Sequence, residues 1–191
     1  MKIAAVIIAG GASSRMGAEK ILLPVGGRRL IDRLLSILPR PVALNANGDP
    51  ARFAGIALPV IADSMEGIGT PLAGLHAALL WAQAQGADAV LTVPSDCPFL
   101  PANLVQRLAA AGVPAVAASG GEVHYLTGLW PVTARPLLES LLTSGMRRAR
   151  DWVQAAGAKE VKWDVVPFDP FMNVNTREEL AEANRIADLS G

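Results

Sequence analysis

Cysteine is almost absent from this sequence, and its scarcity limits the chemistry available to the chain. Cys97 is the single cysteine among 191 residues. An intramolecular disulfide framework and a CxxC metal site are therefore both excluded. A lone thiol fits a reducing compartment, and we expect a cytoplasmic protein.

Net charge is also absent, because 17 Lys and Arg residues balance 17 Asp and Glu residues. Proteins that bind nucleic acid usually present a strongly basic face, so this balance argues against a nucleic-acid partner. The charges are unevenly distributed, since residues 1–40 hold seven bases and two acids and carry a net charge of +5. This asymmetry favours a small anionic ligand near the N-terminal segment, with a solvated basic face as the alternative.

The sequence has no long hydrophobic run, although 51% of its residues are hydrophobic and its mean hydropathy is +0.34. The longest uncharged stretch, residues 67–87, is interrupted by glycines, Pro71, His76 and glutamines. It cannot present about 20 apolar residues to lipid. The short apolar stretch 3–9 is followed closely by Arg15, so we expect a buried strand there and neither a signal peptide nor a membrane partner.

Apolar strand patterns alternate with helical patterns along the chain. Strands are expected at 3–9, 42–44, 59–62, 89–93, 115–118, 123–130 and 161–166, and helices at 30–38, 71–86, 102–110, 134–142, 146–156 and from 176 onward. The last helix opens with a capping-box pattern, Thr176-Arg177-Glu178-Glu179. This alternation predicts a three-layer α/β/α architecture with a mostly parallel mixed sheet. No repeat or linker divides the chain, so we expect a single domain over residues 1–191.

A glycine-rich segment follows the first expected strand. Residues 8–20 read Ile-Ala-Gly-Gly-Ala-Ser-Ser-Arg-Met-Gly-Ala-Glu-Lys. Adjacent glycines let backbone N–H groups approach an oxyanion, and Arg15 and Lys20 supply charge for a polyphosphate. Both the P-loop pattern and the G-x-G-x-x-G pattern are missing, which disfavours a dehydrogenase. Taken alone, a glycine-rich turn could equally be structural.

The whole thirteen-residue string resembles the N-terminal signature of nucleotidyltransferases that activate sugar phosphates and molybdopterin. Within that group it is similar to the molybdenum cofactor guanylyltransferase family. Further similar motifs follow in the family's order along nearly the whole chain, at residues 44–47, 62–64, 69–74, 94–101, 146–148 and 171–176.

The resemblance implies a Rossmann-like nucleotidyltransferase domain. Such an enzyme transfers GMP from GTP to the terminal phosphate of molybdopterin, and pyrophosphate leaves. GTP and molybdopterin would be its small-molecule substrates. Transient contact with other proteins of molybdenum cofactor biosynthesis, or with acceptor proteins, is a further expectation.

The resemblance also assigns nucleotide binding to a set of residues at the ends of the expected strands and in the loops that follow: Ile8, Ala9, Gly10, Gly11, Lys20, Asn45, Asp63, Thr70 and Asp96. It places Arg15 and Lys20 at the phosphates as catalytic cations. A lysine there can neutralise charge that grows on the leaving pyrophosphate. Without the full motif, a solvated Lys20 would be the simpler interpretation.

Asp96 is the candidate metal ligand for Mg²⁺. It follows an apolar strand, and open α/β sheets bind ligands at the carboxyl ends of their strands. One carboxylate together with substrate phosphates and water suffices for Mg²⁺. The alternatives are helix capping for Asp96 and an Asx turn for Asp63.

The candidate pterin contacts are His124, Arg147, Arg148, Asn173 and Asn175. The arginines form a basic cluster that could receive a phosphate, and the two asparagines alternate on an extended segment and so share a face. A histidine hydrogen-bonded within the sheet and an exposed basic helix face are the competing interpretations. Tyr125 follows His124 where the family tends to have proline, and Ser95 precedes Asp96 where it usually has cysteine.

Three other functions remain as alternatives. A CTP-dependent molybdopterin cytidylyltransferase tends to read Ala-Ala-Gly where this chain has Ala9-Gly10-Gly11, and it lacks the Thr-Pro-Leu-Ala-Gly pattern, so both features favour guanine. A sugar-1-phosphate nucleotidyltransferase tends to show Gly-Thr-Arg in the glycine-rich loop. A non-catalytic nucleotide-binding regulator would not need both Lys20 and Asp96.

Overall fold

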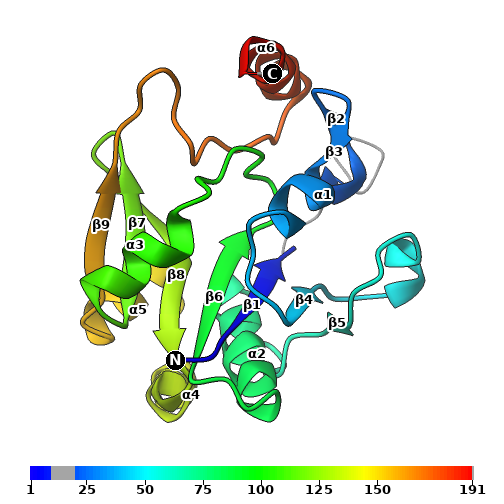
Figure 1. Ribbon diagram of the computed structural model, residues 1–191. Coiled ribbons are helices and arrows are strands. Elements are labelled where there is room, and N and C mark those ends of the chain that lie inside the picture. The colour runs from blue at the N-terminus through cyan, green and yellow to red at the C-terminus, as the bar shows by residue number, and fades with distance from the viewer. Residues whose placement is uncertain (10–19, 191) are drawn as a thin grey trace.

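The computed structural model describes residues 1–9 and 20–190. A seven-stranded sheet runs through the molecule in the order β5-β4-β1-β6-β8-β7-β9 (Figure 1). Strand β8 is antiparallel to both of its neighbours, and every other pair in this sheet is parallel. The predicted mostly parallel mixed sheet is therefore confirmed. The strands are β1 (Ile3–Ile8), β4 (Val42–Asn45), β5 (Val60–Ile61), β6 (Ala89–Pro94), β7 (Ala115–Ser119), β8 (Glu122–Pro131) and β9 (Lys159–Trp163).

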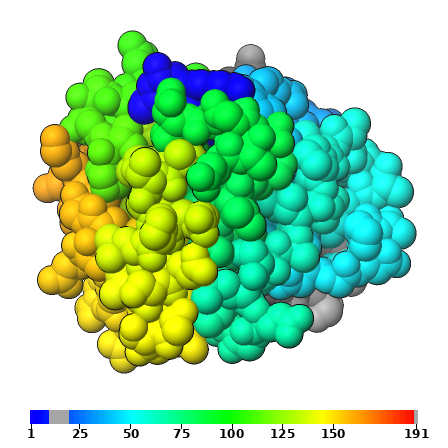
Figure 2. All heavy atoms as spheres, turned by 90° about the horizontal axis from the view of Figure 1, so that it is seen from below, coloured from blue at the N-terminus to red at the C-terminus, as the bar shows by residue number. Residues whose placement is uncertain are grey.

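Helices cover both faces of the sheet. Alternate residues of β1 point to opposite faces, as the pleat of a strand requires. Ala5 and Ile7 pack with α1 (Leu30–Leu35), α3 (Leu104–Ala111) and α6 (Arg177–Ser190). Val6 and its neighbours on the other face pack with α2 (Pro71–Ala84), α4 (Arg135–Thr143) and α5 (Ala149–Ala155). Figure 2 shows this second layer from outside, with the chain around α2 in green beside α4 and α5 in yellow. These three layers confirm the predicted architecture.

The central strands are apolar throughout because they are buried on both faces. From β1 the chain proceeds outward to β4 and β5, and then crosses to β6 on the other side of β1. The strand order therefore reverses between β1 and β6. In open α/β sheets, the crevice at the carboxyl ends of two such strands is where ligands bind.

The expected strand at 161–166 is wrong in its limits, since β9 spans Lys159–Trp163. Parallel pairing with β7 aligns Ala115 with Lys159 and Ser119 with Trp163, so β9 ends where β7 ends. Val165 and Val166 lie beyond it and are 41% and 82% exposed. Their β-branched side chains imitate a strand in the sequence without being buried in one.

A short hairpin, β2 (Pro24–Val25) with β3 (Arg28–Arg29), was not predicted. Short 3₁₀ turns, also not predicted, occur at η2 (Lys20–Leu22), η3 (Pro50–Phe53) and η4 (Val132–Ala134). Helix α6 packs against β2, and the Gly26 N–H donates to Asn184 Oδ1 at 2.9 Å. The last helix therefore lies beside an early segment of the chain (Figure 1). Across residues 1–9 and 20–190, no helix combines the length and apolarity needed to span a bilayer.

Candidate active site

The carboxyl ends of β1, β4 and β6 bring the first candidate residues to one edge of the sheet. Ile8 is in register with Pro94, and the Ser95 N–H donates to Ile8 O at 3.1 Å. On the other side, the Ala9 N–H donates to Asn45 O at 2.8 Å. Ile8, Ala9, Asn45 and the segment leading to Asp96 therefore converge at the crevice between β1 and β6. Gly10, Gly11 and Arg15 lie outside the described residues.

Asn45 and Asp63 belong to one hydrogen-bonded cluster. The buried Asn45 donates through Nδ2 to Ile61 O at 3.1 Å and to Asp63 Oδ1 at 3.0 Å. Asn47 donates to the other carboxylate oxygen of Asp63 at 2.8 Å and accepts from the Asp63 N–H at 2.9 Å. Both oxygens of Asp63 are thus engaged by amides. Asn47 was part of a quoted motif but received no role, because its partner lies 16 residues away in the chain.

Helix α2 approaches this cluster closely at Gly74. A Cβ built at Gly74 would overlap Asn45 Oδ1 and would lie 3.4 Å from Asp63 Oδ1. Glycine at a helical position costs about 1 kcal/mol relative to alanine, and here it allows α2 to lie against the amide. At the start of the same helix, Thr70 occupies the N-cap position. Its Oγ1 is buried and has no hydrogen-bond partner within residues 1–9 and 20–190.

Replacing Gly74 by alanine should destabilise the protein despite the better helix propensity of alanine. The new methyl group would have to displace Asn45, which is held by Ile61 and Asp63. We expect a net loss of about 1–3 kcal/mol in the free energy of unfolding, as overpacking usually causes. Urea denaturation would measure it.

Gly55→Ala is the matched control. Gly55 is exposed and a Cβ there meets no atom within 4 Å. A change within about 0.5 kcal/mol is expected for that variant. A Gly74→Ala protein as stable as the control would contradict the close approach.

Asp96 and Lys20 form the charged centre of the site. Burial raises the pKa of the Asp96 carboxyl above its usual range, and the nearby Lys20 ammonium partly offsets that rise. Lys20 Nζ donates to Asn175 Oδ1 at 2.8 Å, across 155 residues of sequence. The Asp96 carbonyl accepts from the Val174 N–H at 2.9 Å. The segment before α6 therefore positions both groups of the charged centre.

The thiol beside Asp96 is a buried hydrogen-bond donor. Cys97 is buried, and burial raises the pKa of its thiol well above the ordinary value. Its Sγ donates to Asn173 Oδ1 at 2.9 Å. Cys97 thereby orients the Asn173 amide and stays protonated.

The donor set around Asp96 fits a hard divalent cation. A partly desolvated carboxylate favours a neighbouring positive charge, and oxygen ligands suit Mg²⁺. The described part of the chain has no group of three or more His, Cys, Asp or Glu residues placed to hold a metal ion. A cation at Asp96 would therefore take its other ligands from phosphate and water, which Mg²⁺ commonly does.

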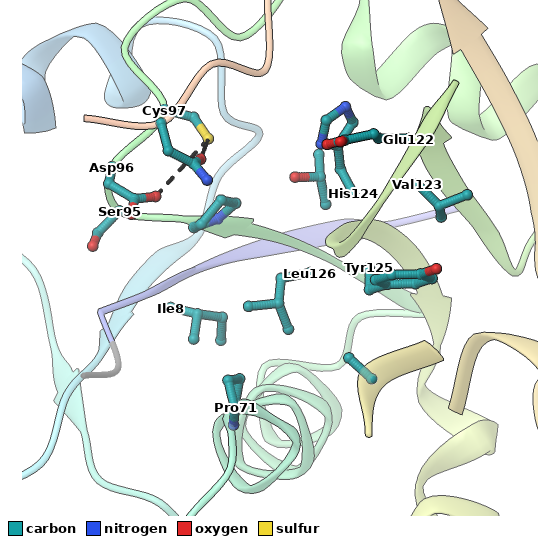
Figure 3. Close-up of a pocket in the computed structure, with 14 residues that line it drawn as sticks. Ile8, Pro71, Ser95, Asp96, Cys97, Glu122, Val123, His124, Tyr125 and Leu126 are labelled. Carbon is teal, nitrogen blue, oxygen red and sulfur yellow. Dashed lines mark hydrogen bonds between the residues drawn. The ribbon is translucent and has the colours of Figure 1, made fainter. Parts of the chain in front are cut away.

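A cavity of about 440 Å³ opens between Asp96 and β8 (Figure 3). Ser95, Asp96 and Cys97 lie on one side of it, and Glu122 and His124 lie on the other. Its only charged lining residues in the described chain are the acids Asp96 and Glu122. Thr127 also lines it, with a buried Oγ1 that has no partner among the described residues. The lining is therefore rich in hydrogen-bond acceptors.

His124 contacts the hydroxyl of Ser119, which is itself bound to Asp169, and the ring of Phe171. His124 Nε2 lies 2.6 Å from Ser119 Oγ, and Ser119 Oγ donates to Asp169 Oδ1 at 2.8 Å. The imidazole stacks on Phe171 with a centroid distance of 4.5 Å. Burial lowers the pKa of His124, with Asp169 and Glu122 acting in the opposite direction. Neither Ser119 nor Asp169 was predicted, because no sequence pattern links them to His124.

The other candidate pterin contacts are placed differently from one another. Asn173 lines the cavity, whereas Asn175 binds Lys20. Arg147 is exposed, and its Nη1 donates to Leu142 O at 2.8 Å and to Met146 O at 2.7 Å near the end of α4. Arg148 is the N-cap residue of α5. Neither arginine lines the cavity, although the following residue, Ala149, does.

Comparison with known proteins shows the family to which this chain belongs. A family model described as a MobA-like NTP transferase domain matches residues 5–161. Molybdenum cofactor guanylyltransferase from Rhodopseudomonas palustris strain BisB5 is 46% identical over 195 residues, covering 96% of this chain and 93% of that protein. The protein of the same name from Rhodobacter capsulatus is 46% identical over 187 residues, covering 96% and 95%.

A solved structure shows the same fold. The crystal structure of molybdopterin-guanine dinucleotide biosynthesis protein A from Archaeoglobus fulgidus has a TM-score of 0.71 at 23% identity. The alignment covers 99% of this chain and 100% of that one. The family match ends at residue 161, so Asn173 and Asn175 lie beyond it.

Proposed function

Because this chain belongs to the MobA-like NTP transferase family, we propose that it acts as a Mg²⁺-dependent molybdenum cofactor guanylyltransferase. It transfers GMP from GTP to the terminal phosphate of molybdopterin. The observation that carries the proposal is the convergence of Lys20, Asp96 and the Asn45–Asp63 cluster beside an acceptor-rich cavity. Nucleotide and acceptor can then meet at the charged centre.

The reaction is a displacement at phosphorus. An oxygen of the molybdopterin phosphate forms a bond to the α-phosphorus of GTP, while the bond from that phosphorus to the bridging oxygen breaks and pyrophosphate leaves. Two anions must approach each other, so positioning and charge neutralisation supply most of the catalysis. Lys20 stabilises the negative charge that grows on the leaving group. Asp96 would hold Mg²⁺, which would supply further neutralisation at the phosphates.

The Asn45–Asp63 cluster and Thr70 serve the nucleotide. Both amides of the cluster are fixed by the Asp63 carboxylate, so they hold a set orientation before a ligand arrives. Thr70 Oγ1 at the start of α2 is a buried hydroxyl without a partner in the described chain. Such groups are satisfied by ligand or water in most proteins. Preorganised donors and acceptors of this kind reduce the cost of ordering on binding.

The cavity suits the pterin better than it suits a phosphate. Its described charged residues are both acidic, and a carboxylate repels an anion. A pterin carries an exocyclic amino group and ring N–H donors, which pair with the carboxylate, hydroxyl and imidazole acceptors of the lining. The pterin ring would occupy the cavity, and its phosphate would lie toward Lys20.

Calorimetric titration with GTP and with CTP, each with and without Mg²⁺, tests the proposal. We expect GTP to bind at least about tenfold more tightly than CTP, equivalent to 1.4 kcal/mol, and Mg²⁺ to strengthen binding. Release of pyrophosphate in the presence of molybdopterin then establishes turnover. A preference for CTP would favour the alternative function, a CTP-dependent molybdopterin cytidylyltransferase. Tight GTP binding without pyrophosphate release would favour a nucleotide-binding regulator.

A further inference from the structure

The hydrogen bonds around His124 determine which of its nitrogens carries the proton. Asp169 Oδ1 accepts from the Phe171 N–H at 2.9 Å and from Ser119 Oγ at 2.8 Å. A serine hydroxyl has one hydrogen, and here it is directed at the carboxylate. The Ser119 oxygen can therefore only accept from His124 Nε2 at 2.6 Å. That contact requires the proton to be on Nε2.

The other nitrogen is then an acceptor. Burial lowers the pKa of His124, which favours the neutral imidazole that carries one proton. With that proton on Nε2, Nδ1 has a free lone pair. Nδ1 has no hydrogen-bond partner within residues 1–9 and 20–190, and His124 lines the cavity opposite Asp96 (Figure 3).

We infer that Ser119 and Asp169 are positioning residues of the acceptor subsite, which keep the proton on Nε2 of His124 so that Nδ1 accepts a hydrogen bond from an N–H group of the bound ring. The inference rests on the proposed function for the identity of that ring. It adds two residues that do not touch the substrate and act through a third. Histidines that bind a metal ion are commonly oriented in this way through their second nitrogen.

The surroundings hold the ring as well as the proton. Phe171 stacks on the imidazole at 4.5 Å with an interplanar angle of 21°, and the Phe171 N–H binds the same carboxylate oxygen as Ser119. Ser119 is only 3% exposed at the end of β7, so water does not compete for its hydroxyl. Orientation and tautomer are therefore set before the acceptor binds.

Nuclear magnetic resonance of the ¹⁵N-labelled protein tests the tautomer without any substrate. The chain has two histidines, and His124→Gln assigns their signals by removing one set. Long-range proton–nitrogen correlation should show His124 neutral with its proton on Nε2. A proton on Nδ1, or an imidazole protonated on both nitrogens at neutral pH, would overturn the inference.

Ser119→Ala then tests the consequence. The variant should populate both tautomers of His124 and raise the KM for molybdopterin about tenfold, the size expected when one buried hydrogen bond is lost. The KM for GTP and the kcat should stay near their wild-type values, because Ser119 does not touch the nucleotide site. An unchanged KM for molybdopterin would overturn the inference.

Ser144→Ala is the matched control, since that serine donates to Ser140 O near the end of α4, away from the cavity. It should leave both the tautomer and every kinetic constant unchanged. If the protein transfers no guanylyl group, the proposed function fails. The tautomer of the unmodified protein still decides whether Ser119 and Asp169 position His124.

Discussion

Replacing Asp96 by asparagine should lower kcat on the order of 10³-fold while the protein remains folded. The carboxylate lies just beyond the carboxyl end of β6, where it lines the cavity and interacts with the Lys20 charge. Asparagine keeps its shape and removes its charge, so the proposed metal ion loses its anionic protein ligand. Burial already raises the pKa of this carboxyl, which means that the charge is not held there by a favourable environment. We therefore expect the melting temperature not to fall.

Steady-state pyrophosphate release and circular dichroism at matched protein concentration check this prediction. Asp164→Asn is the control, because Asp164 is exposed in the loop after β9, and it should retain full activity. Calorimetry should also show that Mg²⁺ no longer strengthens GTP binding to Asp96→Asn. Wild-type turnover in that variant would show that Asp96 neither binds the metal ion nor contributes to catalysis.

Replacing Lys20 by alanine should lower kcat by about 10²-fold and change the affinity for GTP much less. The ammonium group acts mainly when charge accumulates on the leaving pyrophosphate, so its loss affects the transition state more than the bound nucleotide. Lys20→Arg keeps the charge and should recover part of the rate. Asn175→Ala removes only the amide that holds Lys20 Nζ, and a smaller loss is expected.

Single-turnover kinetics combined with calorimetric GTP binding separates these effects. Lys162→Ala, on the exposed part of β9, controls for the loss of one positive charge. It should change neither the single-turnover rate nor the affinity for GTP. If Lys20→Ala loses affinity and keeps its rate, Lys20 binds the ground state only. If both are unchanged, Lys20 is a solvated charge.

The sequence predicted the sheet well because strands that are buried on both faces consist of continuous apolar residues. Continuous apolar runs identified β1 and β6, and Gly120-Gly121 identified the turn into β8. The same reasoning failed at β9, where Val165 and Val166 are apolar but exposed. The hydrophobic pattern of a sequence indicates which residues could be buried in a strand. Which of them are buried depends on where the neighbouring strand ends, as β7 does for β9.

The site was predictable only where its residues end a strand or belong to a family motif. Asn173 and Asn175 were expected to share one ligand, since alternate residues of an extended segment share a face. In the structure Asn173 lines the cavity and accepts from Cys97, whereas Asn175 binds Lys20. Arg147 was predicted to belong to a basic cluster that could receive a phosphate, with an exposed helix face as the alternative. It is exposed, and its guanidinium donates to two carbonyls near the end of α4. Ser119 and Asp169 could not be predicted at all, because a local sequence pattern does not show which distant segments come into contact.

The route by which Lys20 is held has a consequence for how the protein is made. Glu179 accepts from the backbone N–H groups of Asn175 and Thr176, while Thr176 Oγ1 accepts from the Glu179 N–H at 3.1 Å. The amide that holds the lysine is therefore anchored to the first turn of the last helix. Asn175 follows Lys20 by 155 residues, so a ribosome must add all of them before this lysine acquires its partner. A nascent chain released before residue 175 would lack the amide that orients Lys20.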